Sequence, residues 1–314
     1  MKIVFALLLN LFCLSAYGFD LYGHRGARGL SPENTLPAYQ TALKNHVDYV
    51  DMDVTMTKDH VLVVQHDLTL NPDITRDAKG KWIQKRRILI KNLTLKQLQQ
   101  YDVGRIKPGT QYAKIFSSQQ SVDGAYIPTL KEVIAYVKKA AGNHVGFQIE
   151  IKTDPNHPEL TYSPQDLAEA LAKIISEEKI INRTQVQAFD WRCLLALQKI
   201  NPKIATAYLT YADEEKLLQN ENPNIAGLWT AGKLLKNYHN SIPEMIKALG
   251  GKYWDPQDTE VTQDLVNKAH ELGLKVIVWS WPEQSGKVVD DPLVKKLISM
   301  GVDGIITDRP DLRP

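Results

Sequence analysis

Short apolar stretches alternate with helical patterns along most of the chain. Strand candidates cover 21–23, 49–55, 145–151, 185–189, 204–209, 225–229, 275–281 and 304–307. Helical spacing of apolar residues predicts helices near 35–45, 165–178, 191–199, 213–220, 232–249, 261–272 and 291–300. This rhythm is typical of parallel strands joined by crossover helices. A further candidate at 252–255 raises the strand count above eight, and the sequence does not say which candidate is surplus.

The length favours one closed barrel. The chain has 314 residues, and a (β/α)8 barrel of the TIM type takes about 250 residues as one unit. No linker rich in Gly, Ser or Pro is long enough to split it. Residues 68–128 lack the strand and helix rhythm, so we expect one barrel domain over 19–314 with an insertion over the mouth at about 68–128. A mobile surface loop without substrate contact is the alternative.

Residues 61–66 form a special strand candidate, because only 57–60 separate them from the strand before. Parallel strands need a connection of about a dozen residues or more, so we predict a hairpin. If Lys58-Asp59 is a two-residue turn, Asp51 lies opposite His66 on one face. A slip of one residue would move His66 to the other face.

Residues 1–18 have the pattern of an export signal. Lys2 supplies a positive start, 3–14 an apolar core, and Ala16-Tyr17-Gly18 a cleavage site before Phe19. The apolar run is shorter than the roughly 20 residues that span a bilayer. We therefore expect an exported protein, periplasmic or secreted, without stable membrane insertion.

Cysteine content and net charge argue against internal disulfides and against nucleic acid as a partner. Once the signal is removed, Cys193 stands alone and allows no intramolecular disulfide. Loss of Lys2 takes 38 basic residues to 37 against 36 acidic ones, a balance of 37 − 36 = +1. This balance does not favour nucleic acid as a partner, and the oligomeric state stays open.

Acidic residues alternate along two strand candidates. Asp51 and Asp53 are two apart, so both side chains point to one face, and Glu150 and Lys152 repeat the arrangement on a later strand. Two or three carboxylates with water suit Ca²⁺ or Mg²⁺. The alternative is ordinary surface polarity, which is less common in barrel strands because both faces are covered.

Proton carriers and a phosphate ligand stand beside these acids in the sequence. His24 ends the first strand and Arg25 follows it, while His66 ends the hairpin. Arginine offers a fork of donors suited to phosphate, and histidine moves protons near neutral pH. The set indicates metal-assisted cleavage of a phosphate ester.

A helix start is expected directly after this arginine. Ser31 is a candidate cap and Pro32 suits the first turn. Glu33 then either favours the helix dipole or, being close to His24 and Arg25, orients Arg25 or a metal-bound water.

An ordered set of motifs is similar to the glycerophosphodiester phosphodiesterase family. The motifs are His24-Arg25-Gly26, Pro32-Glu33-Asn34-Thr35, Asp51-Met52-Asp53, Val63-Val64-Gln65-His66-Asp67, Ile127-Pro128-Thr129-Leu130, Glu150-Ile151-Lys152, Gln187-Ala188-Phe189-Asp190, Val278-Trp279-Ser280 and residues 301–310. They span nearly the whole chain after the signal.

The resemblance implies an exported barrel enzyme that hydrolyses glycerophosphocholine or glycerophosphoethanolamine to glycerol 3-phosphate and an alcohol, with Ca²⁺ or Mg²⁺. Together with the residue patterns it assigns proton transfer to His24 and His66, substrate binding to Arg25, Lys152, Glu33 and Trp279, and metal binding to Asp51, Asp53 and Glu150. Which histidine is the acid, and whether water or a glycerol hydroxyl attacks first, stay open.

The chain departs from the family pattern at three places. Asp51 stands where the family usually has Glu, Ala188 replaces a common serine, and Trp279 is followed by Ser280-Trp281-Pro282. Two rival functions also remain. One is a phospholipase D-like lyase on lysolipids, which calls for an apolar mouth, and the other is a non-catalytic binder of phosphodiesters.

Overall fold

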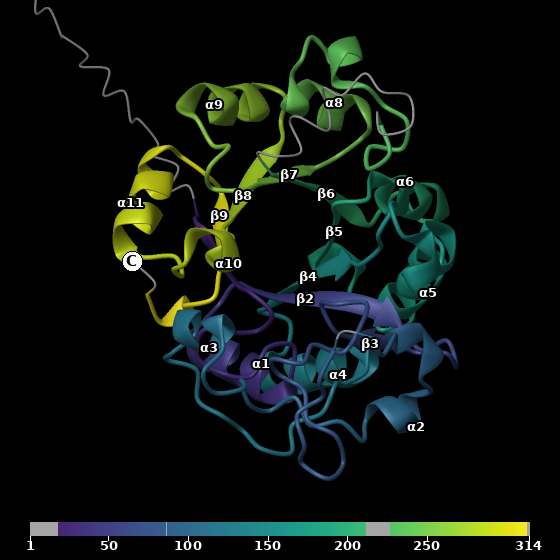
Figure 1. Ribbon diagram of the computed structural model, residues 1–314. Helices are drawn as coiled ribbons and strands as arrows, with labels where there is room; N and C mark the ends of the chain where they lie inside the picture. Colours follow the sequence, from purple (N-terminus) through teal and green to yellow (C-terminus); the bar gives the residue numbers. More distant parts are fainter. Residues whose placement is uncertain (1–17, 86, 212–226, 313–314) are drawn as a thin grey trace, which may run out of the picture.

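The structure is a computed structural model that describes residues 18–85, 87–211 and 227–312 (Figure 1). The predicted export signal, apart from Gly18, and the predicted helix at 213–220 lie outside these residues. The predicted barrel is confirmed. Nine strands occur in the described ranges, and all except the antiparallel β3 (Leu62–Val64) are parallel, which leaves eight barrel strands.

The barrel closes because the first strand pairs with both the second strand and the last. The eight parallel strands are β1 (Asp20–Gly23), β2 (Tyr49–Met56), β4 (Gly146–Ile151), β5 (Thr184–Ala188), β6 (Ala205–Thr210), β7 (Tyr253–Pro256), β8 (Lys275–Trp279) and β9 (Gly304–Thr307). Gly23 is in register with Val50 of β2 on one side and with Thr307 of β9 on the other. The carboxyl ends of the strands therefore meet around one mouth.

Helices form a ring around the strands (Figure 1). The outer helices in the described ranges are α1 (Leu36–Lys44), α4 (Leu130–Ala141), α5 (Pro164–Glu177), α6 (Trp191–Ile200), α8 (Ile242–Ala248), α9 (Gln263–Glu271) and α11 (Asp291–Ser299). Shorter helices are α2 (Leu95–Leu98), α3 (Gln111–Ile115), α10 (Pro282–Ser285) and the 3-10 turns η1 (Ile90–Asn92), η2 (Pro158–Leu160), η3 (Ile181–Arg183), η4 (Leu235–Tyr238) and η5 (Pro310–Leu312). Helix α5 shows why they pack here, since Leu167, Leu171 and Ile175 recur every four residues and are fully buried.

Two predicted elements in the second half of the chain differ from the structure. The surplus strand candidate is 225–229, because its described residues form a turn and β7 supplies the strand. The predicted helix 232–249 is two elements, η4 and α8. His239 and Asn240 between them have φ of 56° and 54°, a left-handed backbone that no helix continues through.

The predicted hairpin exists, but its register is shifted by one residue. Val54 pairs with Val64 and Met56 with Leu62, so the loop is 58–60 and not a two-residue turn. His60 takes the left-handed conformation, with φ of 59°, that closes a three-residue loop. The predicted pairing of Asp51 with His66 is therefore wrong.

The barrel interior holds both apolar and polar side chains. Tyr22, Ile277 and Ile306 pack together there. The amide of Gln148 donates to Asp255 Oδ2 at 2.9 Å, and both of these side chains are fully buried. The inside of the barrel is therefore filled by side chains.

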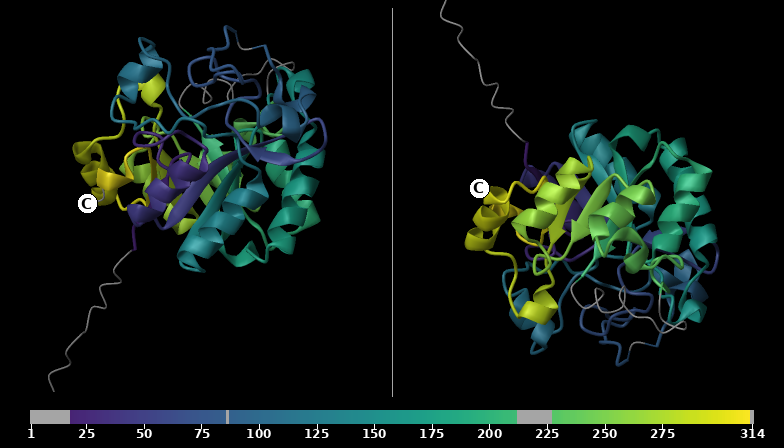
Figure 2. Two further views of the ribbon diagram at one scale, coloured as in Figure 1. Left: turned by 90° about the horizontal axis from the view of Figure 1, so that it is seen from below. Right: turned by 90° about the horizontal axis from the view of Figure 1, so that it is seen from above.

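The insertion at 68–128 has small apolar cores of its own and lies at the carboxyl ends of the strands (Figure 2). One core contains Leu70, Ile90 and Leu98, and another packs Tyr112 on Phe116. The insertion therefore stands beside the mouth as a folded unit. Among the described residues, no helix is long and apolar enough to cross a membrane.

Candidate active site

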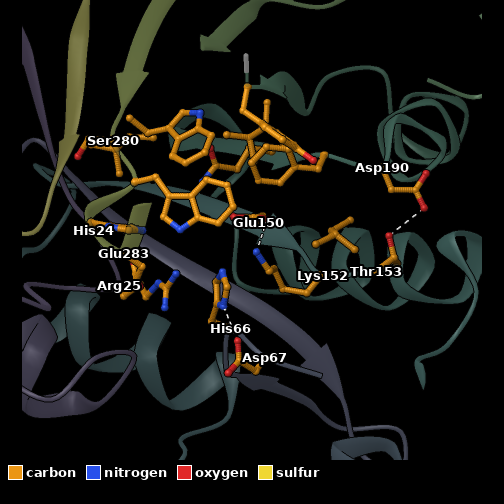
Figure 3. Close-up of a pocket in the computed structure, with 18 of the residues that line it drawn as sticks. His24, Arg25, His66, Asp67, Glu150, Lys152, Thr153, Asp190, Ser280 and Glu283 are labelled. Carbon is orange, nitrogen blue, oxygen red and sulfur yellow. Dashed lines mark hydrogen bonds and ion pairs between the residues drawn. The ribbon is translucent and has the colours of Figure 1, made fainter. Parts of the chain in front are cut away.

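The mouth of the barrel contains a cavity of about 460 Å³. The predicted residues that line it are His24, Arg25, His66, Glu150, Lys152 and Trp279. Figure 3 shows His24, Arg25 and His66 next to one another, with Glu150 and Lys152 close by. Asp51, Asp53 and Glu33 lie just beneath this surface and contact its residues.

His24 is held by a carboxylate from the other end of the chain. Its Nδ1 lies 2.8 Å from Oδ1 of Asp308, which follows β9. Burial opposes ionisation of Asp308, but the positive charges of Arg28 and His24 outweigh it and lower the pKa of the carboxyl. An ionised carboxylate only accepts hydrogen bonds, so Nδ1 carries the hydrogen. Nε2 is then the nitrogen left for proton transfer.

Arg28 anchors the same carboxylate. Its Nε and Nη2 donate to the two oxygens of Asp308 at 2.7 and 3.0 Å, and its Nη1 donates to Glu283 at 2.6 Å. The ring of Phe116 from the insertion lies 4.4 Å below the guanidinium carbon. This fully buried cation fixes Asp308 and links the insertion to the site.

His66 reaches the cavity even though the hairpin register differs. Strand β3 ends at Val64, so the alternation of a strand does not govern His66. Its Nδ1 lies 2.8 Å from Oδ1 of Asp67, and its side chain is 30% exposed. Burial, together with the positive charges of Arg25 and Lys152, lowers the pKa of His66 to about 4. The imidazole is therefore neutral over most of the usual pH range.

Arg25 sits on a strained turn between β1 and α1. Its φ is 49°, and its backbone N–H donates to Asp51 Oδ2 at 3.0 Å. Nη1 donates to Glu33 at 2.8 Å, and Nε is 3.6 Å from Asp53. Tyr112 of the insertion also donates to Glu33. Glu33 therefore orients Arg25, and orientation of Arg25 is one of the roles expected for it from the sequence.

The predicted helix start before Glu33 is wrong. Helix α1 begins at Leu36, and Thr35 is its cap. Asn34 precedes the cap in the left-handed region, with φ of 55°, so the helix cannot start earlier. Its side-chain amide donates to Asp53 at 2.8 Å, which explains why the turn holds this conformation.

Asp53 and Glu150 meet one lysine. Asp53 is in register with Glu150 on the neighbouring strand, and the ammonium of Lys152 lies 2.5 Å from Glu150 and 3.6 Å from Asp53. Burial raises the pKa of Glu150 to about 7, with Asp53 adding to the effect and Lys152 opposing it. Two adjacent carboxylates need positive charge, and here Lys152 supplies it.

Asp51 lies deepest of the three acids. Its Oδ1 accepts from Gln187 at 2.7 Å and its Oδ2 from the Arg25 backbone, and it is 2% exposed. Burial and the charge of Asp53 raise its pKa.

The fit of this cluster to a divalent cation rests on its donors. Glu150 lines the cavity and Lys152 contacts both Glu150 and Asp53, so carboxylates of the kind that Ca²⁺ or Mg²⁺ prefers lie near one another there. In the described part of the chain, no group of three or more His, Cys, Asp or Glu side chains stands in a geometry ready to hold a metal. The cation site at Asp51, Asp53 and Glu150 stays a prediction.

Five residues that hold the site received no role in the sequence analysis, although three of them stand in the family motifs. They are Arg28, Asn34, Gln187, Glu283 and Asp308. Asp308 could have been found, because it follows a strand that ends at the mouth, where barrel chemistry collects. The signal is weaker for Arg28 and Glu283, which stand five and four residues beyond the ends of β1 and β8 and are brought together only by the closed barrel.

Comparisons with known proteins agree with this geometry. Residues 24–312 match the model of the glycerophosphoryl diester phosphodiesterase family. YhdW of Bacillus subtilis is 28% identical over 93% of this chain and 95% of its own length. A glycerophosphodiester phosphodiesterase of Bacillus altitudinis is 27% identical, with 93% and 95% covered.

Solved structures share the fold. The crystal structure of a glycerophosphoryl diester phosphodiesterase homologue from Silicibacter pomeroyi has a TM-score of 0.80 and 29% identity, covering 94% of this chain and 91% of that one. An Oleispira antarctica phosphodiesterase in complex with the product sn-glycerol-3-phosphate has a TM-score of 0.64 and 20% identity, with 93% of each chain covered. With a family match over residues 24–312, this chain belongs to the glycerophosphoryl diester phosphodiesterase family.

Proposed function

We propose that the protein hydrolyses glycerophosphodiesters, such as glycerophosphocholine or glycerophosphoethanolamine, to glycerol 3-phosphate and an alcohol. One observation carries the proposal: two histidines, each with Nδ1 on a carboxylate, face the same cavity as a buried arginine. Family membership supports the same reaction.

The two histidines are suited to opposite proton transfers. Each imidazole keeps Nδ1 for its carboxylate and presents Nε2 to a substrate. One, with Nε2 unprotonated, takes the proton from the attacking oxygen, and the other, which must be protonated on both nitrogens, gives its Nε2 proton to the leaving alkoxide. Either water or a neighbouring glycerol hydroxyl attacks.

The phosphate would lie between Arg25 and Lys152. Arg25 is fixed by Glu33, so its guanidinium needs no rearrangement when the phosphate arrives. Lys152 is within reach of both acids and the cavity. Both cations meet the charge that grows on the phosphoryl oxygens.

We also propose a divalent cation, Ca²⁺ or Mg²⁺, held by Asp53, Glu150 and Asp51. When bound, such a cation supplies Lewis acid stabilisation of phosphate charge. The register of Asp53 with Glu150 supports it, because it places two carboxylates, the ligands that these cations prefer, on neighbouring strands beside the cavity.

The test is product release by the purified protein lacking residues 1–18. Glycerophosphocholine, glycerophosphoethanolamine and micellar lysophosphatidylcholine are offered separately. Glycerol 3-phosphate from the two diesters is measured by a coupled dehydrogenase, and choline from the lysolipid by choline oxidase, because cleavage of a lysolipid leaves the acyl chain on the glycerol phosphate. Release from the two water-soluble diesters supports the proposal. Activity on the lysolipid alone would favour the lyase, and binding without turnover would favour the non-catalytic binder.

We further propose export to the periplasm or the medium. The pattern of residues 1–18 supports it. N-terminal sequencing of the protein made in a bacterial host checks the cleavage, and a chain outside the cytoplasm that begins near Phe19 is the expected result.

A further inference from the structure

Aromatic side chains form one wall of the active-site cavity. They are Phe189 after β5, Tyr211 after β6, Trp229, Trp279 at the end of β8 and Trp281. The histidines, Arg25 and the acids come from β1 to β4, so the two groups of residues occupy different parts of the barrel mouth. Figure 3 shows rings filling the space between Ser280 and Asp190.

Three ring pairs of this aromatic wall stand at steep angles, and a fourth, Trp279 with Trp281, is tilted by 41°. Phe189 meets Tyr211 at 75° and Trp279 at 82°, with centroids 5.7 and 5.4 Å apart. Tyr211 meets Trp281 at 85° and 6.0 Å. Rings at right angles present faces and edges around a shared space, and ring faces carry partial negative charge. The ammonium of Lys152 lies 5.9 Å from the centroid of the Phe189 ring, within the range of a cation–π contact.

The carboxylates that line the cavity already have partners. Asp190 accepts from Arg192 at 2.7 and 2.8 Å. Glu283 is bound to Arg28, Glu150 to Lys152, and Asp67 to His66. A primary ammonium that enters the aromatic wall would lose water and meet ring carbons in its place, which is costly for a hydrogen-bond donor. A quaternary ammonium has no N–H group to satisfy.

We propose that the aromatic wall is a headgroup subsite that selects the trimethylammonium group of choline over the primary ammonium of ethanolamine. The inference rests on the proposed diester hydrolysis for its catalytic readout. Aromatic faces around a cation are the usual means of binding quaternary ammonium. The phosphate would lie toward Arg25 and the choline toward Trp281, which is 39% exposed at the rim.

Three diesters of glycerol phosphate distinguish recognition of the headgroup charge from recognition of its shape. One carries choline, one carries ethanolamine, and one carries the carbon analogue of choline, in which a neutral tert-butyl group replaces trimethylammonium. We expect kcat/KM for the choline diester to exceed both others by about tenfold or more. Equal or better use of the carbon analogue would overturn the proposal and indicate an apolar site for a lipid chain. Equal use of all three would also overturn it.

A binding measurement keeps the subsite separate from the reaction. Phosphocholine and phosphoethanolamine are titrated into the protein, and tryptophan fluorescence is followed. Tighter binding of phosphocholine, by about tenfold, supports the subsite even if no diester is cleaved. In that case the proposed hydrolysis fails and the subsite stands. Equal affinities would overturn the subsite whatever the turnover.

Substitutions at the rim test the role of the ring. Trp281→Phe keeps an aromatic face, while Trp281→Leu keeps only apolar volume. We expect the choline to ethanolamine ratio of kcat/KM to be largely retained in W281F and to fall by about tenfold in W281L. Trp82→Leu is the matched control, since Trp82 lies on the insertion against Arg76 and should leave the ratio unchanged. Equal ratios in W281L and the unmodified protein would contradict the proposal.

Discussion

Nδ1 of His24 donates a hydrogen bond to Asp308 at 2.8 Å, across 284 positions of sequence. The contact exists because the barrel closes between its first and last strands, which places the residues after β1 and β9 side by side. Arg28 then holds the carboxylate with two further bonds. Closure of the fold therefore also orients the imidazole that we propose to be catalytic.

Replacing Asp308 with Asn should lower kcat by roughly a thousandfold. The amide can leave His24 in the wrong tautomer, and an equivalent change in a serine protease triad costs about ten thousandfold. KM should change much less. Steady-state kinetics of D308N test this. Circular dichroism checks that the variant still folds, since Arg28 loses one of its carboxylate partners. Asp311→Asn, a surface control, should leave kcat unchanged. A normal kcat in folded D308N would contradict the role given to Asp308.

Replacing either histidine of the pair with Ala should abolish turnover and leave folding intact. His66 is 30% exposed, so its loss removes little packing. Product release and thermal unfolding are measured for H24A, H66A and the control H157A, whose side chain is 62% exposed. Near-normal turnover in H66A would contradict the scheme of two histidines.

The pKa of His66 should be close to 4 in the folded protein. Burial and the positive charges of Arg25 and Lys152 lower it from 6.5, and a bound cation would lower it further. Between pH 6.5 and pH 4, His66 binds a proton in the unfolded chain but not in the folded protein. This group therefore lowers the free energy of unfolding as the pH falls through that range. NMR titration of the imidazole measures the midpoint, which should rise in Lys152→Met. A midpoint near 6.5 in the unmodified protein would contradict this environment.

Replacing Asp51 with Glu should preserve or raise activity. Asp51 lies beneath the cavity, bound to Gln187 and to the Arg25 backbone. One more methylene keeps the same charge and brings it toward Asp53 and Glu150. Calorimetry with Ca²⁺ and Mg²⁺, beside the neutral control Asp51→Asn, measures the effect on binding. Loss of cation binding in D51E would show that the site is built around the shorter acid.

The sequence predicted the elements better than the contacts between them. The spacing of apolar residues and the lengths of the apolar runs predicted the parallel strands and most helices, because strand and helix formation depends on neighbours along the chain. The hairpin register failed, since a left-handed residue at His60 lengthened the loop by one. The start of α1 was wrong for a similar reason. The hydrogen bond from Asn34 to Asp53, which is distant in the sequence, accompanies the left-handed backbone that delays the helix.

The candidate site was predictable where strand alternation governs it. Asp53 and Glu150 meet because they are in register on neighbouring strands. His66 lines the cavity for a different reason from the one expected, because the strand ends before it. Arg28 and Glu283 meet through closure of the barrel and the path of α10, which no local pattern encodes.

The most direct test of the account is glycerol 3-phosphate release from glycerophosphocholine with the cation controlled. The protein is treated with EDTA, dialysed, and assayed alone and with Ca²⁺ or Mg²⁺ returned. We predict loss of release on chelation and recovery with at least one of the two cations. Full release from the chelated protein would contradict the proposed cation at Asp51, Asp53 and Glu150, and no release under any condition from the folded protein would contradict the proposed hydrolysis.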